Sequence, residues 1–201
     1  MKRSLFRILG AVVPGGIALA ACAGGAATPA APARAGVQPA RSHTAADVHF
    51  MSGMISHHTQ AVVMAGWAVD SAHGASPRVR VLSERIIVAQ SDEIAFLERW
   101  LRERYQVRMD HAMLMPGMLT TNQLAQLDVA RGPEFDRLFL TFMIQHHEGA
   151  VTMVDALLGS HGAGQDGLVF RFAADVHADQ TTEIDRMRLM LAALPPGGKT
   201  P

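Results

Sequence analysis

The sequence predicts an all-α protein whose folded part is a four-helix bundle built from two similar hairpins. Long segments carry apolar side chains at helical spacing, and none shows the sustained alternation that a half-buried strand requires. Gly and Pro residues separate these segments. A motif centred on two adjacent histidines occurs twice, at 54–64 and at 143–153. The repeat indicates that one helical hairpin was duplicated.

Residues 1–21 have the composition of an export signal. A basic start precedes an apolar stretch that Pro14 interrupts, and this stretch is too short and too broken to form a stable membrane span. It ends in Leu19-Ala20-Ala21-Cys22, which resembles the bacterial lipobox. That resemblance implies cleavage before Cys22 and lipidation of its sulfur, whereas the alternative is an ordinary signal peptide with an incidental cysteine. Both interpretations predict export, and the first predicts a cell-envelope lipoprotein.

Residues 22–43 are mostly Ala, Pro and Gly, which predicts a flexible tether because such a composition cannot bury a core. Residues 44–195 remain for one domain with a sizeable core. Cys22 is the only cysteine, so this domain has neither a disulfide nor a thiolate metal ligand. The 18 basic and 18 acidic side chains give no basic excess, which argues against nucleic acid as a partner. No later segment is apolar enough to span a bilayer.

The first hairpin is expected over about 45–105. Its first helix is predicted over 45–73, where Thr44 is the N-cap and Asp47 follows three residues later, a pattern close to a capping box. Pro77 then opens the second helix, since proline is favoured at the first helical position.

The second hairpin is expected over about 133–194, after a connection at 106–132 that contains a short helix following Thr120. Gly132-Pro133 opens its first helix, and Pro195 ends its second. Four long helices with short connections within each pair are typical of a four-helix bundle. The duplication predicts pseudo-twofold packing, which would bring equivalent positions together near the bundle axis.

The duplicated motif combines imidazole and thioether side chains on a helix. Its spacing predicts that at least one histidine of each pair faces the core. A methionine four residues before the second histidine can share a face with it. These candidate metal ligands are His57, His58 and Met54 in the first copy, and His146, His147 and Met143 in the second.

Two interpretations of the buried histidines compete. Burial of neutral imidazoles without partners costs about 1–3 kcal/mol each, which favours either a metal site or a structural His–Glu hydrogen-bond network. Glu93 and Glu183 could serve as metal ligands or as acceptors that fix an imidazole tautomer. Imidazole and thioether donors without thiolate suit copper, especially Cu(I), whereas zinc or iron would depend on the two carboxylates. The Glu-x-x-His spacing of di-iron bundles does not occur in these segments.

The connection between the hairpins is rich in methionine. Either it binds a soft metal, or it covers the open end of the bundle, which methionine does well because it is flexible and polarizable. Methionines at helical spacing are most often packing residues. The additional candidate ligands are Met64, Met153, Met109, His111, Met113, Met115 and Met118.

The pattern Phe-x-x-x-Met-Ile-x-His-His-x-x-Ala-Val-x-Met, at 50–64 and 139–153, resembles the signature of an exported bacterial family catalogued as domain of unknown function 305. The segments that begin at Gln90, Gln180 and Met115 are also similar to that family. The resemblance implies a ferritin-like helical bundle, and it implies periplasmic copper binding and copper tolerance, with which some members are associated.

The sequence departs from the family pattern at Ser56, where proline is common, and at Thr59-Gln60, where the second copy has Glu148-Gly149. The first half-site is therefore expected to be the weaker one.

Together these patterns predict an exported protein that buffers, sequesters or carries copper in the cell envelope. No Ser-His-Asp set, nucleophilic thiol or phosphate loop occurs, so binding is favoured over catalysis. The alternatives are a metal-free envelope interaction module and, less favoured, a His/carboxylate metalloenzyme. The expected partners are a metal ion and a membrane reached through the lipid anchor, while a homo-oligomer and a metal-delivery partner stay open.

Overall fold

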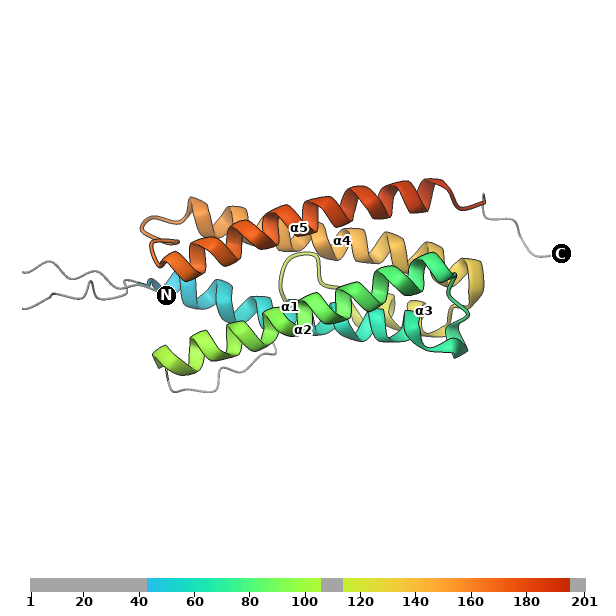
Figure 1. Ribbon diagram of the computed structural model, residues 1–201, viewed down its shortest axis with the longest axis horizontal. Helices are drawn as coiled ribbons and strands as arrows, with labels where there is room; N and C mark the ends of the chain where they lie inside the picture. The colour runs from blue at the N-terminus through green and yellow to red at the C-terminus, as the bar shows by residue number, and fades with distance from the viewer. Residues whose placement is uncertain (1–42, 106–113, 196–201) are drawn as a thin grey trace, which may run out of the picture. The chain divides into compact units, whose positions relative to one another are not determined.

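The computed structural model describes residues 43–105 and 114–195, and within these ranges it is helical with no strand (Figure 1). The all-α prediction is therefore confirmed. The predicted export signal, the tether up to residue 42 and Cys22 lie outside the described residues, as do Met109, His111 and Met113. The elements are α1 (Ala45–Val69), the short 3₁₀ helix η1 (Ser71–His73), α2 (Pro77–Tyr105), α3 (Thr121–Val129), α4 (Gly132–Gly159) and α5 (Gly167–Ala192).

The start of α1 has the predicted capping box. The Thr44 hydroxyl accepts a hydrogen bond from the Asp47 N–H at 3.2 Å, and the Asp47 carboxylate accepts one from the Thr44 N–H at 2.6 Å. The prediction of a continuous helix to residue 73 was wrong, because α1 ends at Val69. The Asp70 carboxylate accepts from the Ala72 N–H at 2.9 Å, and this local bond turns the chain into η1.

The helices pack mainly within two hairpins. α1 makes its most extensive contact with α2, and α4 makes its own with α5. The contact between α1 and α4 is the main one between the hairpins. Figure 1 shows these long helices side by side, with α3 and the loop before it beside α1 and α4. The middle of the α1–α4 contact is therefore the place where the two hairpins meet.

The core consists of two hydrophobic clusters. The first cluster includes Phe50 and Met54 from the beginning of α1 together with Val154 from the end of α4. The second cluster includes Met64 from the end of α1 together with Phe139 from the beginning of α4. α1 and α4 therefore run in opposite directions past each other, and the duplicated histidines lie between the two clusters.

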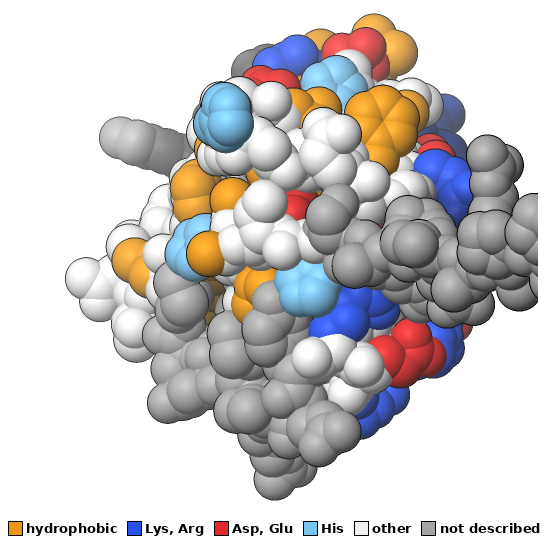
Figure 2. All heavy atoms as spheres, turned by 90° about the vertical axis from the view of Figure 1, so that its left-hand side faces the viewer, with side chains coloured by type: hydrophobic (Ala, Val, Ile, Leu, Met, Phe, Trp, Pro, Cys, Tyr) orange, Lys and Arg blue, Asp and Glu red, His pale blue; other side chains and the backbone are white. Residues whose placement is uncertain are grey.

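In the part of the chain that the structure describes, no helix is long and apolar enough to cross a membrane. Figure 2 looks onto the end of the helices at which α1 begins, and histidine side chains lie there among hydrophobic, charged and uncharged ones. This end of the domain therefore carries solvent-exposed imidazole groups, which are separate from the buried histidines of the core.

Candidate metal centre

Both histidines of each pair are buried, and all four have an exposed fraction of 0%. The spacing of the motif required only one of each pair to face the core. The structure buries the second one as well because it points toward the other helix of its own hairpin. His58 faces Glu93 on α2, and His147 faces Glu183 on α5.

The first histidines of the two copies meet where α1 crosses α4. The ring centroids of His57 and His146 are 3.7 Å apart, with the ring planes tilted by 41°. His57 Nε2 lies 3.0 Å from the carbonyl oxygen of Pro116 and donates to it, because a carbonyl can only accept. Its Nδ1 therefore carries an unprotonated lone pair, and that atom has no hydrogen-bond partner. Neither ring nitrogen of His146 has a partner.

The second histidines each contact a carboxylate. The distance from Nε2 to the carboxylate oxygen is 2.7 Å for His58 with Glu93 and 2.7 Å for His147 with Glu183. The His147 contact is a hydrogen bond, whereas the His58 contact lies off the hydrogen-bond direction. A carboxylate acceptor keeps the proton on Nε2 and leaves Nδ1 basic, an arrangement common behind metal-binding histidines.

The central imidazoles are neutral in the folded protein. Burial, followed by electrostatic repulsion from His58, lowers the pKa of His57 from 6.5 to about 3, and the hydrogen bond to the Pro116 carbonyl opposes this shift. Burial, followed by repulsion from His57 and His147, lowers the pKa of His146 well below 6.5. Neutral imidazole is the form that binds metal ions.

Carboxylates gather beside the second histidines. Burial raises the pKa of Asp179 on α5, and the charges of Glu93, Glu183 and Asp175 raise it further. Glu93 and Glu183 are 22% and 26% exposed, so they connect the buried imidazoles with solvent. This grouping of negative charge favours the approach of a cation.

The methionines of the motif border the histidines from both sides. Met54 and Met153 belong to the first cluster, whereas Met64 and Met143 belong to the second. All four are buried, with exposed fractions of 5% or less. Their described contacts are hydrophobic packing, so thioether donors lie in the walls next to the imidazoles.

A loop at 114–119, which we call the strap, covers the crossing of α1 and α4. It carries the Pro116 carbonyl that accepts from His57. The Gln60 side chain holds its end, since it accepts from the Leu119 N–H at 2.7 Å and donates to the Leu119 carbonyl at 3.1 Å. Gly149 lets the strap lie directly on α4, because a Cβ there would stand 2.5 Å from the Gly117 Cα.

Sequence reasoning offered a covering role for this connection, at the open end of the bundle, but missed that the strap lies over the crossing of α1 and α4 and contacts His57. The available signal was the difference between the two copies, since Gln60 and Gly149 occupy equivalent positions. Of the candidate ligands on the connection, Met115 is buried and packs over Gly53. Met118 is half-buried, and its sulfur accepts from the Met115 N–H at 3.3 Å.

The donor geometry separates two kinds of metal site. Among the residues that the structure describes, no group of three or more His, Cys, Asp or Glu side chains is arranged to hold a metal ion. What fits a metal is the set of orphaned nitrogens, His57 Nδ1 and both nitrogens of His146, between methionine-lined walls. This donor set suits a soft ion better than one that needs several carboxylates.

Fold and site together define an all-helical domain with a candidate metal centre made by two equivalent histidine pairs. The chain belongs to the family described as Domain of unknown function (DUF305), whose model matches residues 47–191. The resemblance predicted from the sequence is therefore confirmed.

Solved structures show the same fold. A DUF305 fragment from Deinococcus radiodurans is 27% identical, with a TM-score of 0.67 over 76% of this chain and 99% of that chain. A DUF305 protein of Streptomyces coelicolor, described as a candidate secreted protein, is 26% identical, with a TM-score of 0.65 over 73% and 91%. CopM in its Cu(I)-bound form is 28% identical, with a TM-score of 0.58 over 73% and 95%. CopM is also known in Cu(II)-bound and Ag-bound forms.

One curated relative covers a short part of the chain. The uncharacterized protein L153 of Acanthamoeba polyphaga mimivirus is 36% identical over 58 residues, which is 29% of this chain and 37% of that protein.

Proposed function

We propose that this protein binds copper through its duplicated histidine motif, and that it buffers, sequesters or carries the metal outside the cytoplasm. The observation that carries the proposal is the contact between His57 and His146, where the buried Nδ1 of His57 and both ring nitrogens of His146 lack partners. Orphaned buried polar atoms cost about 1–3 kcal/mol each, and coordination of a metal would recover that cost. The likeness to copper-bound and silver-bound CopM supports the choice of metal.

The proposed site has two layers. His57 and His146 would bind the metal directly, with Met54 and Met143 as supporting thioethers. His58 and His147 are candidate ligands through their unpartnered Nδ1 atoms, while Glu93 and Glu183 orient their rings. When bound, copper would supply a soft cation that neutral nitrogen and sulfur donors stabilise.

We also propose that the four long helices form a ferritin-like bundle that arose by duplication of a hairpin. Equivalent aspartates support this proposal, because each one binds the loop of the opposite hairpin. Asp47 on α1 accepts from the Gly164 N–H at 2.7 Å, and Asp136 on α4 accepts from the Ser76 N–H at 3.0 Å. The two hairpins also match near the centre of the domain, because the His58–Glu93 and His147–Glu183 distances are equal.

The place of action is proposed from the sequence. The basic and apolar leader and the lipobox-like segment ending at Cys22 support export and a lipid anchor, and residues 22–43 support a tether. A sharp test is metabolic labelling of the expressed protein with a fatty acid, which Cys22→Ser should abolish.

A titration with Cu(I) under anaerobic conditions, in competition with a chromogenic chelator, tests the proposed function. His57→Ala combined with His146→Ala should lose most of the stoichiometric copper binding of the full chain. His161→Ala combined with His177→Ala is the matched control, because it removes two exposed histidines and should leave binding unchanged. Circular dichroism establishes that the helices persist, and a His57→Gln, His146→Gln variant replaces the alanine pair if they do not.

Wild-type stoichiometry in the double alanine variant would contradict the assignment of the ligands. If the wild-type chain fails to bind copper tightly, the alternative function gains support. In that alternative the His58–Glu93 and His147–Glu183 contacts are a structural network in a metal-free interaction module. The distances of 2.7 Å in both pairs are the observation that favours it.

A metalloenzyme is less favoured. It requires the carboxylates to reach the histidines, and they do. However, both carboxylates approach Nε2, and Glu183 accepts a hydrogen bond from that atom of His147, so it serves as an acceptor and not as a fellow ligand.

A further inference from the structure

We propose a second binding site for a soft monovalent cation, separate from the histidine pairs, in a pocket between α1 and α4. Two thioethers and one imidazole form its donor set, from Met115, Met153 and His49. The site goes beyond the proposed function, because it shares neither His57 nor His146 and would exist without them.

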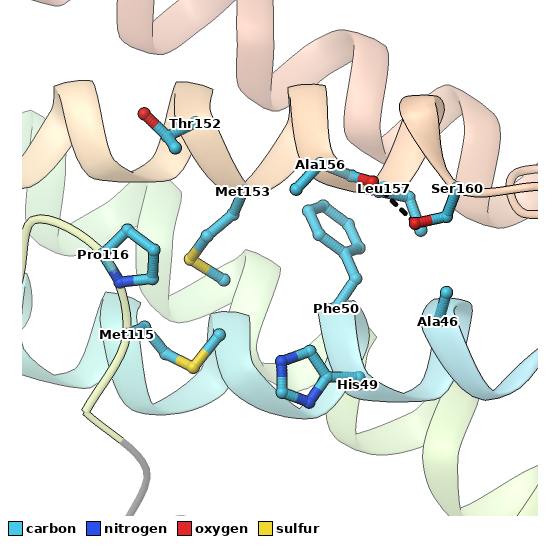
Figure 3. Close-up of a pocket in the computed structure, with 10 residues that line it drawn as sticks. All are labelled: Ala46, His49, Phe50, Met115, Pro116, Thr152, Met153, Ala156, Leu157 and Ser160. Carbon is cyan, nitrogen blue, oxygen red and sulfur yellow. Dashed lines mark hydrogen bonds between the residues drawn. The ribbon is translucent and has the colours of Figure 1, made fainter.

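The pocket has a volume of about 170 Å³. Figure 3 shows three donor-bearing side chains around the same space, each on a different segment. Met153 extends from α4, Met115 from the strap and His49 from α1. The pocket is lined by Ala46, His49, Phe50, Met115, Pro116, Thr152, Met153, Ala156, Leu157 and Ser160.

The position of the Met115 thioether depends on a glycine in α1. A Cβ at Gly53 would lie 2.5 Å from the Met115 Cε and 3.0 Å from its sulfur. Glycine inside a helix costs about 1 kcal/mol relative to alanine, and here it makes room for the methionine. The Met115 N–H donates to the Met118 sulfur at 3.3 Å, which ties down the same part of the strap.

The His49 side chain is exposed, and its ring nitrogens are available as metal ligands. Within the described part of the chain, its ring has no hydrogen bond and no ion pair, and the one side-chain bond to this residue is donated by the Ser52 hydroxyl to its backbone carbonyl. It differs in this respect from His58 and His147, whose rings contact carboxylates. An imidazole at the rim of a methionine-lined pocket can close over a bound ion.

The other polar groups of the pocket are already used. The Thr152 hydroxyl donates to the Glu148 carbonyl at 2.9 Å, and the Ser160 hydroxyl donates to the Ala156 carbonyl at 2.8 Å. No carboxylate lines the pocket. Neutral sulfur and nitrogen donors without an anionic ligand select Cu(I)-like ions over hard divalent cations. The three rotatable bonds of methionine allow both thioethers to close on an ion smaller than the pocket.

Silver(I) is the probe for this site, because it is a soft monovalent cation that does not change oxidation state in air. Met115→Leu combined with Met153→Leu keeps the volume of both side chains and removes both sulfurs, so the fold should persist. Equilibrium dialysis of the full chain, with metal analysis, should show one Ag(I) fewer per chain than wild type. Met187→Leu combined with Met190→Leu, which changes two methionines of α5 near the second cluster, should retain wild-type binding.

Two further variants separate this site from the histidine pairs. His57→Ala combined with His146→Ala should keep the Ag(I) ion that the leucine pair loses. Gly53→Ala should weaken that ion's binding about tenfold, because it displaces the Met115 thioether without removing a donor.

NMR spectra of chains labelled on the methionine methyl groups give an independent test. Ag(I) should shift the Met115 and Met153 methyl signals in wild type and in the His57→Ala, His146→Ala variant. Unchanged Ag(I) stoichiometry in the leucine pair, or unshifted signals from both methionines, would overturn the proposal and leave an apolar pocket only.

Discussion

Gly149→Ala should dislodge the strap from the crossing of α1 and α4. The glycine lies on α4 three residues after His146, where the strap rests on the helix. A Cβ at this position would collide with the Pro116 carbonyl oxygen and would lie 2.5 Å from the Gly117 Cα. Both neighbours are backbone atoms, so no side chain can rotate away from the added methyl group.

The magnitude follows from three contributions. Relief of the collision requires the strap to move by about 1 Å, and overpacking of this kind costs about 1–3 kcal/mol. The movement also breaks the 3.0 Å hydrogen bond from His57 Nε2 to the Pro116 carbonyl, which is worth about 1 kcal/mol. The higher helix propensity of alanine offsets about 1 kcal/mol of this loss of stability. The free energy of unfolding should therefore fall by about 1–3 kcal/mol.

Urea denaturation of the metal-free chain, followed by circular dichroism, measures the change. Gly66→Ala is the matched control, because this glycine is exposed in α1 and a Cβ there has no neighbour within 4 Å. The control should raise the free energy of unfolding by about 1 kcal/mol through helix propensity alone. The two variants should therefore differ by about 2–4 kcal/mol, although each makes the same chemical change.

Equal stabilisation by both substitutions would refute the reasoning. It would mean that α4 carries no backbone contact at residue 149, and that the strap does not hold the His57 tautomer through Pro116. A loss of stability in Gly149→Ala without any change in the His57 ring signals, observed by NMR, would refute the second part alone.

Three further predictions concern the surroundings of the site. Glu93→Gln combined with Glu183→Gln should weaken Cu(I) binding about 10–100-fold in a competition titration and leave helicity unchanged, whereas full affinity would show that the carboxylates do not tune the imidazoles. Gln90 is 3% exposed, and neither its amide nitrogen nor its amide oxygen has a hydrogen-bond partner. Gln90→Leu should therefore keep the free energy of unfolding unchanged or raise it by about 1–3 kcal/mol, as measured by urea denaturation. A clear decrease would reveal a hydrogen-bond partner of the Gln90 amide. Burial raises the pKa of Asp166, but a backbone N–H and Arg104 lower it more, so its pKa lies below the ordinary value. The carboxylate therefore stabilises the fold above the pKa of the unfolded chain, about 4, and this contribution is lost as the pH falls through the lower folded pKa. The stability difference between wild type and Asp166→Asn should accordingly shrink on acidification, and a difference independent of pH would exclude this origin.

The sequence by itself determined most of the helical elements and the presence of paired histidines in the core. Helix starts depend on residues a few positions apart, which is why the Thr44–Asp47 box and the start of α2 at Pro77 could be predicted. The repeat likewise pointed to paired histidines in the core. The end of α1 was misplaced because the Asp70 side chain competes with the helix for backbone N–H groups, and helical periodicity does not register that competition.

The tertiary structure alone decided how the two copies meet. Spacing along a helix restricts a side chain to a face, but the rotation of one helix against another depends on packing throughout the core. The contact of His57 with His146 is therefore a property of the assembled domain. The different roles of Gln60 and Gly149, which occupy the same position in the two copies of the motif, are also decided by the assembled domain. There the amide of Gln60 binds the strap, whereas the missing side chain of Gly149 lets the strap lie against α4.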